Sequence, residues 1–180
     1  MDFQESRTYA NLLAAYNSEL MSSSQYEIDS NKARREGYIE ISDVFSTTAG
    51  QERAHAVIWS QILNNGSTPS TEQNLTNALQ YETYVATEMY PEFAHIADEE
   101  GYSEIASLFK GVANIELIHE AEFINLEENV SNNQVFCKEV DVLWICINCG
   151  NVLSGVCAPE ICPICGFPQG YYKVFVNVNV

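Results

Sequence analysis

The chain has 180 residues, a formal net charge of −17 and 46% hydrophobic residues. This hydrophobic content is enough for a folded core, which excludes a disordered acidic tail. The negative charge repels phosphate backbones and anionic lipids, so we expect neither nucleic acid nor a membrane surface as a partner. The length suits one domain, or a medium domain followed by a small one stabilised by metal.

The N-terminus carries early acidic residues and lacks the basic start and long apolar run of a secretory signal. The longest charge-free stretch, residues 142–159, contains asparagines, glycines and cysteines, which are unlike a membrane helix. We therefore expect a cytoplasmic protein. All six cysteines lie between positions 137 and 165, and four of them form C-x-x-C pairs. In a reducing compartment, this pattern indicates metal binding rather than disulfides.

A change of composition near residue 131 predicts two domains. The residues before it show helical apolar spacing, whereas those after it form short β-rich runs between Cys, Gly and Pro turns. The polar stretch 131–134 is the expected linker. We predict a mainly α protein, with a helical domain over residues 1–135 and a small β-rich metal domain over residues 136–180.

The helical part contains an internal repeat. Residues 36–55 align without a gap with residues 100–119 at an offset of 64, and nine positions match. Upstream, residues 11–19 match residues 74–82 at an offset of 63, so one residue has slipped between the two blocks. Each half is expected to be a helix with one glutamate, followed by a helix with a Glu-x-x-His motif.

This repeat predicts a four-helix bundle with a pseudo-twofold axis. The segment 64–69, which is rich in Asn, Gly and Pro, is the expected crossover between the halves. Pro91 should kink or interrupt the third helix. The four helices are expected at about residues 5–34, 38–64, 71–100 and 102–130.

The two Glu-x-x-His motifs predict a dinuclear metal site. Residues three apart on a helix share a face, so each motif directs a carboxylate and an imidazole to one point. With the lone glutamates, the set is that of carboxylate-bridged dimetal sites in four-helix bundles. Four glutamates in one core require cations, and oxygen-rich ligands favour iron or manganese. The six expected ligands are Glu19, Glu52, His55, Glu82, Glu116 and His119.

A single Glu-x-x-His motif is more often a surface pair than a ligand pair. Two such motifs at repeat-equivalent positions, each preceded by a helix with its own glutamate, favour the metal site instead. The third histidine of the chain, His95, has no comparable partner in the sequence. We expect it on a solvated helix face.

Two C-x-x-C turns, each followed by glycine, predict a tetrahedral tetrathiolate site. Spacing alone does not distinguish iron from zinc, so a structural zinc ribbon stays open. Cys137 and Cys157 fall outside the paired spacing, and we expect both to be free thiols, with Cys157 open to oxidation. The four expected ligands are Cys146, Cys149, Cys162 and Cys165.

Over nearly its whole length, the chain resembles the rubrerythrin family. The resemblance lies in AYNSE ending at Glu19, ERAH at 52–55, the segment 82–94, ELIH at 116–119, and VLWICINCG with APEICPICG. It implies a ferritin-like bundle with a non-haem di-iron centre, joined to a rubredoxin-like iron tetrathiolate domain. It also implies a homodimer or higher oligomer in which the tetrathiolate of one subunit serves the di-iron centre of another.

The resemblance further implies that Tyr26 and Tyr90 form hydrogen bonds near the metals. One departure concerns Val85, which stands where the family usually has a further glutamate. In the family, that carboxylate exchanges with the first Glu-x-x-His histidine when the iron changes oxidation state. Glu88 is a weak substitute, about 120° round the helix. We therefore expect His55 to stay bound in both redox states.

The function implied by the resemblance is a di-iron peroxidase that reduces hydrogen peroxide to water in oxidative-stress defence. The tetrathiolate iron would return electrons to the iron pair, drawing them from a reduced-nicotinamide-dependent reductase or from rubredoxin. Val85 motivates an alternative, a di-iron oxidase or ferroxidase that uses dioxygen. The zinc interpretation leaves a third, a non-enzymatic helical scaffold that makes protein contacts.

Overall fold

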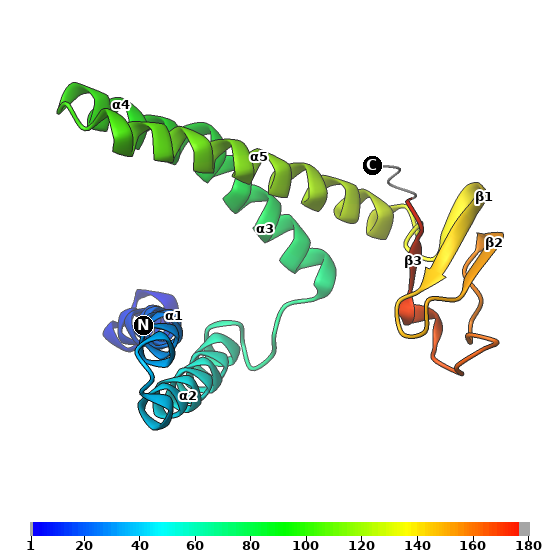
Figure 1. Cartoon of the computed structure of the whole chain (residues 1–180), viewed down its shortest axis with the longest axis horizontal. Helices are drawn as coiled ribbons and strands as arrows, with labels where there is room; N and C mark the ends of the chain where they lie inside the picture. Colours follow the sequence, from blue (N-terminus) through cyan, green and yellow to red (C-terminus); the bar gives the residue numbers. More distant parts are fainter. Residues whose placement is uncertain (1, 177–180) are drawn as a thin grey trace. The chain divides into compact units, whose positions relative to one another are not determined.

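The computed structural model describes residues 2–176 (Figure 1). The chain is mainly helical and ends in a small antiparallel sheet, which confirms the predicted fold class. It forms two compact units, Met1–Pro69 and Ser70–Val180. Among the described residues, no helix combines the length and the apolar character needed to cross a membrane. The boundary between residues 135 and 136 stays a prediction.

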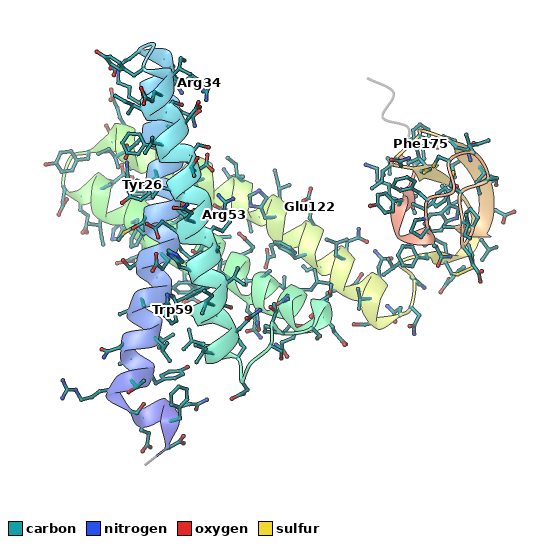
Figure 2. All side chains as sticks on the ribbon, turned by 90° about the horizontal axis from the view of Figure 1, so that it is seen from below. Tyr26, Arg34, Arg53, Trp59, Glu122 and Phe175 are labelled. Atoms are coloured by element: carbon teal, nitrogen blue, oxygen red, sulfur yellow. A yellow bond between two sulfur atoms is a disulfide. The ribbon has the colours of Figure 1, made fainter. Side chains whose placement is uncertain are left out.

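The first unit is a pair of helices, α1 (Arg7–Arg35) and α2 (Ile39–Leu63), preceded by a short 3-10 turn, η1 (Phe3–Glu5). Helix α1 begins at Ser6, whose hydroxyl accepts a hydrogen bond from the Tyr9 amide at 3.1 Å. It ends at Gly37, which has a φ of +87° that glycine adopts without strain. Figure 2 shows Tyr26, Arg53 and Trp59 along this pair.

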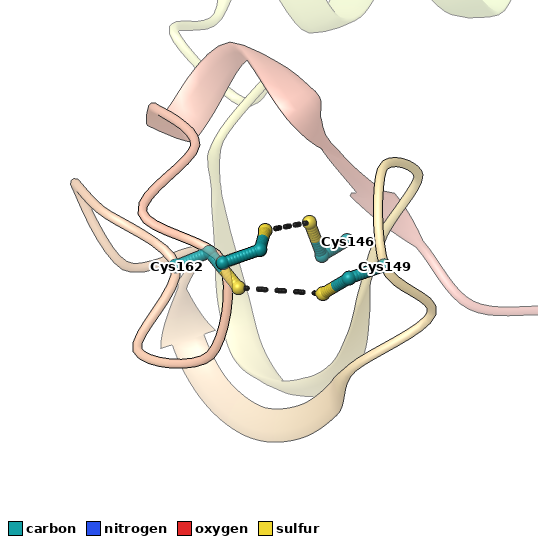
Figure 3. A group of neighbouring side chains, drawn as sticks. Cys146, Cys149 and Cys162 are labelled. Carbon is teal, nitrogen blue, oxygen red and sulfur yellow. Dashed lines mark hydrogen bonds between the residues drawn. The ribbon is translucent and has the colours of Figure 1, made fainter.

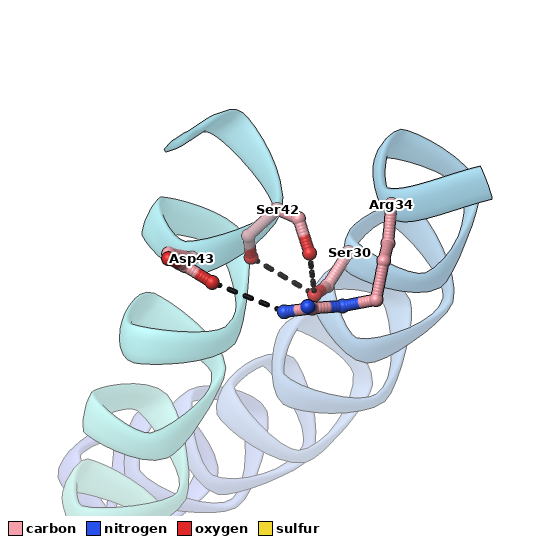
Figure 4. Close-up of polar contacts among 4 residues, drawn as sticks. All are labelled: Ser30, Arg34, Ser42 and Asp43. Carbon is pink, nitrogen blue, oxygen red and sulfur yellow. Dashed lines mark hydrogen bonds and ion pairs between the residues drawn. The ribbon is translucent and has the colours of Figure 1, made fainter. Parts of the chain in front are cut away.

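Small residues spaced by seven bring α1 and α2 together. Ser42, Ala49 and Ala56 are buried on α2, as are Ser23 and Ser30 on α1. The Ser23 hydroxyl donates to the Ala49 carbonyl at 2.9 Å, and the Ser30 hydroxyl donates to the Ser42 carbonyl at the same distance (Figure 4). These short side chains let the helices approach closely, so the larger apolar side chains project from other faces of the pair.

The helices of the second unit are α3 (Thr71–Tyr84), α4 (Tyr90–Glu99) and α5 (Ser103–Ser131). A π-helix, η2 (Val85–Met89), joins α3 to α4. The amide of Tyr90 donates to the carbonyl of Val85, five residues back. Pro91 offers no amide hydrogen and cannot continue a regular α-helix ladder. The expected interruption of the third helix near Pro91 is therefore confirmed, and it takes the form of a π turn.

The π-helix contains the one-residue slip of the internal repeat. Glu19 corresponds to Glu82 at an offset of 63, whereas Tyr26 corresponds to Tyr90 at an offset of 64. The extra residue falls between them, where the wider π turn accommodates it. Beyond the slip, the halves match again. Tyr26 packs on Phe45 with a 6.0 Å centroid separation, and Tyr90 packs on the equivalent Phe109 at 6.1 Å.

The same seven-residue spacing recurs on α5, but its chemistry changes along the helix. Ala106 and Ala113 are buried, as their equivalents are on α2. The next two positions are glutamates that accept hydrogen bonds from threonines of α3, each at 2.6 Å. Polar pairs thus replace small residues over half of this contact, and they are Thr83 with Glu120 and Thr76 with Glu127.

The C-terminal sheet has three antiparallel strands in the order β2-β1-β3, formed by β1 (Cys137–Cys146), β2 (Val152–Cys157) and β3 (Tyr172–Val174). A 3-10 turn, η3 (Gln169–Tyr171), precedes β3. Trp144 is fully buried at the centre of the sheet, and its indole donates to the Gly155 carbonyl at 3.0 Å. The small core around it includes two of the expected metal-binding cysteines.

The expectation that Cys137 and Cys157 are free thiols is wrong. The two residues are paired across β1 and β2, and a disulfide joins them. They lie 20 residues apart in the chain. Only the antiparallel register places them opposite each other, so the cysteine spacing gave no indication of the bond.

Replacing Cys137 with serine should destabilise the sheet only under oxidising conditions. A disulfide that closes a loop of this length contributes about 3 kcal/mol by restricting the unfolded chain. The measurement is guanidinium unfolding followed by Trp144 fluorescence, in a Trp59→Phe background that removes the second tryptophan. Cys157→Ser should lose the same amount. Equal stabilities of variant and parent without reductant would contradict the bond.

Candidate metal centres

The first unit brings three of the expected ligands together. Glu19 comes from α1, and Glu52 and His55 lie one helical turn apart on α2. The His55 Nδ1 lies 2.9 Å from a Glu52 carboxylate oxygen and 3.7 Å from one of Glu19. Ligands about 2.1 Å from a first-row metal lie about 3 Å apart at neighbouring positions. These separations therefore suit one shared ion.

The second unit repeats this triad. Glu82 comes from α3, and Glu116 and His119 come from α5. The His119 Nδ1 lies 2.7 Å from a Glu116 oxygen and 3.8 Å from one of Glu82. The two triads thus agree closely in geometry, as expected from the sequence repeat. The structure gives the two units no fixed placement, so the meeting of all six ligands stays a prediction.

Glu82 carries the clearest sign that a cation belongs in its triad. One of its carboxylate oxygens is buried without a hydrogen-bond partner among the described residues. Burial raises the pKa of Glu82, and the neighbouring Glu116 raises it further, although His119 acts in the opposite direction. A buried carboxylate without a donor is costly, whereas a bound metal ion satisfies it. The donor set therefore fits a metal ion, with two oxygens and one nitrogen from each triad.

Glu120 is a further carboxylate beside the second triad that the sequence analysis did not single out. It directly follows His119 and accepts the hydrogen bond from Thr83, which directly follows Glu82. The equivalent position in the first unit is Ala56. The seven-residue spacing with Ala106 and Ala113 could have placed Glu120 at the helix contact. Its sequence alone did not show that a threonine faces it.

Val85 is buried immediately after the second triad, with 2% of its surface exposed. It begins the π-helix, so its side chain belongs to the packed interior of the unit rather than to solvent. Glu88 is exposed and lines a separate hollow of about 430 Å³ with Tyr84 and Glu92. Neither residue belongs to a described ligand group. The structure therefore supports the expectation that Glu88 does not replace the missing carboxylate.

The tyrosines and His95 lie outside the triads. Tyr26 and Tyr90 are held by ring contacts with Phe45 and Phe109. No contact of their hydroxyls with a triad is given for the described residues, so their role near the metals stays a prediction. His95 is exposed and lies 3.4 Å from Glu99 on the same helix. This position agrees with the solvated helix face expected for it.

The four expected cysteines converge between the two C-x-x-C turns (Figure 3). The sulfur of Cys146 lies 3.8 Å from that of Cys165, and the sulfur of Cys149 lies 3.7 Å from that of Cys162. A tetrahedron with metal–sulfur bonds of about 2.3 Å has edges of about 3.8 Å. The four thiols therefore have the spacing of a tetrahedral metal site.

The two turns that carry these cysteines are built alike. Gly150 and Gly166 have φ values of +76° and +72°, and their amides donate to the carbonyls of Cys146 and Cys162 at 2.8 and 2.9 Å. The buried Tyr172 hydroxyl lowers the pKa of Cys162 to about 6, and backbone amides of its turn act in the same direction. This environment favours the thiolate, which is the form that binds metal.

Comparisons with known proteins agree with these ligand sets. The Rubrerythrin family model matches residues 10–127, and the model of the rubredoxin-like domain of rubrerythrin matches residues 144–173. Rubrerythrin of Nitratidesulfovibrio vulgaris is 37% identical, with 94% of each chain covered. Rubrerythrin-1 of Clostridium acetobutylicum is 35% identical, with 93% of this chain and 94% of the relative covered.

A solved structure of nigerythrin in a mixed-valence state is 26% identical, covers 94% of this chain and 87% of its own, and has a TM-score of 0.36. Rubrerythrin domains hold a di-iron site and a rubredoxin-type iron, and both ligand types are present here. The family-model matches and the identities over most of the chain lead to one conclusion. The chain belongs to the rubrerythrin family.

Proposed function

We propose that this protein is a non-haem di-iron peroxidase that reduces hydrogen peroxide to water in oxidative-stress defence. Its family is of the oxidoreductase type. The observation that carries the proposal is the occurrence of two equivalent Glu-Glu-His triads and a tetrathiolate group in one chain. A scaffold protein has no need of the two triads, whereas a two-electron reduction needs a pair of redox-active ions and a means of refilling it.

Each triad is assigned to one iron, so the six expected ligands form one dinuclear site. The iron pair supplies two electrons together, so that peroxide, two electrons and two protons give two waters without release of a hydroxyl radical. The four carboxylates offset the charge of the ions, and the histidines tune them. The ring contacts of Tyr26 and Tyr90 fix each ring, which leaves the hydroxyl to donate or accept near the ions.

The tetrathiolate group is assigned to a single iron that carries one electron at a time. The backbone amides and Tyr172 around Cys162 stabilise negative charge on sulfur, which favours reduction as well as metal binding. A reductase that uses reduced nicotinamide, or rubredoxin, is the proposed donor. This supply places the protein in the cytoplasm.

Val85 supports a second candidate, an oxidase or ferroxidase that uses dioxygen. A valine cannot bind iron, and its burial leaves no room for a nearby carboxylate to replace it. His55 would then remain a ligand in both oxidation states. The choice between peroxide and dioxygen depends on whether the missing carboxylate is needed for fast reaction with peroxide.

Stopped-flow oxidation separates the two candidates. The reduced protein is mixed anaerobically with one equivalent of hydrogen peroxide, and the red ferric-thiolate absorption is followed. We expect the colour to return much faster with peroxide than with dioxygen, because both electrons leave the iron pair in one step. Faster return with dioxygen would replace the peroxidase by the oxidase.

The Val85→Glu variant tests the role of the missing carboxylate. Glutamate at this position should increase the rate with peroxide relative to the rate with dioxygen, since it supplies the ligand that exchanges with His55. Val85→Gln is the matched control, with nearly the same shape and no charge, and its rate ratio should equal that of the parent. Iron content verifies that both variants retain the site. An unchanged ratio in Val85→Glu would sink the exchange account.

Metal analysis tests the ligand assignment. The parent should hold one ion for each of the three ligand groups, all of them iron. Cys162→Ser should lose the red colour and one iron while keeping the other two, because the helical ligands are untouched. Cys157→Ser, whose residue lies outside the tetrathiolate group, should keep all three. Zinc in the thiolate group of protein from iron-replete cells would remove the proposed relay.

A further inference from the structure

Both helical units expose a large apolar stripe with a ligand histidine at its centre. On α2, Ile41, Val44, Ile58 and Ile62 are all exposed and lie within about 60° of His55 round the helix. Val44, for example, is 61% exposed. Aliphatic side chains that flank a metal ligand in this way indicate the inner face of a bundle rather than a solvated surface.

The stripe on α5 matches the stripe on α2 position by position. Ile105, Leu108, Ile115 and Leu126 are exposed and lie within about 40° of His119. Three of them are the repeat equivalents of stripe residues on α2. Leu108, the counterpart of Val44, is 69% exposed. Each stripe therefore has the shape, the apolar character and the half set of ligands that the other one needs, so an α1–α2 unit and an α3–α5 unit cover each other.

The connection between the units decides whether both can come from one chain. The ligand set is that of ferritin-like proteins, which have one long crossover between helices that run in the same direction. An α-helix rises about 1.5 Å per residue, so Leu63 lies about 12 Å past His55, and Glu82 lies about 16 Å past Thr71. With the ligands level, the connection must therefore return about 28 Å and step about 10 Å sideways.

The connection is too short for this path. Helix α2 ends at Leu63 and α3 begins at Thr71, so seven residues join them. Fully extended, the chain from Leu63 to Thr71 reaches at most about 28 Å, which is less than the required path of about 30 Å. The chain is also coiled here, since the Gly66 amide donates to the Gln61 carbonyl at 2.7 Å and the Ser67 amide donates to the Asn64 carbonyl at 3.4 Å.

We propose that two copies of this chain exchange helix pairs, so that each iron site combines Glu19, Glu52 and His55 of one copy with Glu82, Glu116 and His119 of the other. This inference rests on the six-ligand iron site of the proposed function. The dimer holds two such sites, and the stripe on each α2 is covered by the α3–α5 unit of the second copy. No connection then has to cross the length of a bundle.

Complementation between two defective chains tests this exchange. One chain carries Glu52→Ala and His55→Ala, and the other carries Glu116→Ala and His119→Ala. They are produced together with different affinity tags, and mixed dimers are isolated on both tags in turn. Iron is counted with Mössbauer spectroscopy, in which the tetrathiolate iron counts the chains.

With exchanged helices, a mixed dimer has one intact iron pair and one site with both defects. Its content of iron pairs should be half that of the parent, whereas each variant alone should have none. A matched control combines Glu52→Ala, His55→Ala chains with Glu19→Ala chains, since both defects then lie in α1–α2 units. These mixed dimers should contain no intact pair.

Absence of iron pairs from the first mixed dimer, with the parent fully loaded, would overturn the exchange and leave the iron site standing. Absence of mixed dimers would also overturn it. A parent without iron pairs would instead refute the dinuclear site and the exchange together. Equal iron in the test and control dimers would show that the defects do not report on shared sites, which again contradicts the exchange.

Discussion

The structure depends on the cost of placing carboxylates in the middle of apolar helix faces. Glu52 and Glu116 lie beside exposed aliphatic side chains, at positions that a bundle must bury. Buried without cations, they repel one another and lose their hydration. Metal binding, closure of the bundle and completion of the ligand set are therefore one event. This coupling explains why each helix pair, taken by itself, has an uncovered inner face.

The two halves share a plan but differ at the points that affect chemistry. The triads agree to about a tenth of an ångström in their His–Glu separations, and the Tyr–Phe contacts agree as closely. The second half adds a π-helix, a buried valine and the Thr83–Glu120 hydrogen bond. π-helices often occur at functional sites, because they change the facing of the residues that follow. Here the extra residue restores the match between Tyr90 and Tyr26.

The C-terminal module shows where sequence spacing suffices and where it fails. The C-x-x-C-Gly turns placed Cys146, Cys149, Cys162 and Cys165 around one point because each turn fixes its own geometry within a few residues. Cys137 and Cys157 form their bond through the register of two strands. Strand register depends on the whole sheet, so local spacing could not reveal it.

The sequence by itself determined the elements and their local chemistry. Helix periodicity, the repeat and the Glu-x-x-His spacing identified both triads, since residues three apart on a helix share a face whatever the tertiary structure. Only the tertiary structure decided how the halves of the repeat differ. It placed the slipped residue in the π-helix, paired Thr83 with Glu120, buried Val85 and joined Cys137 to Cys157. These features depend on contacts between segments far apart in the chain, which local spacing does not encode.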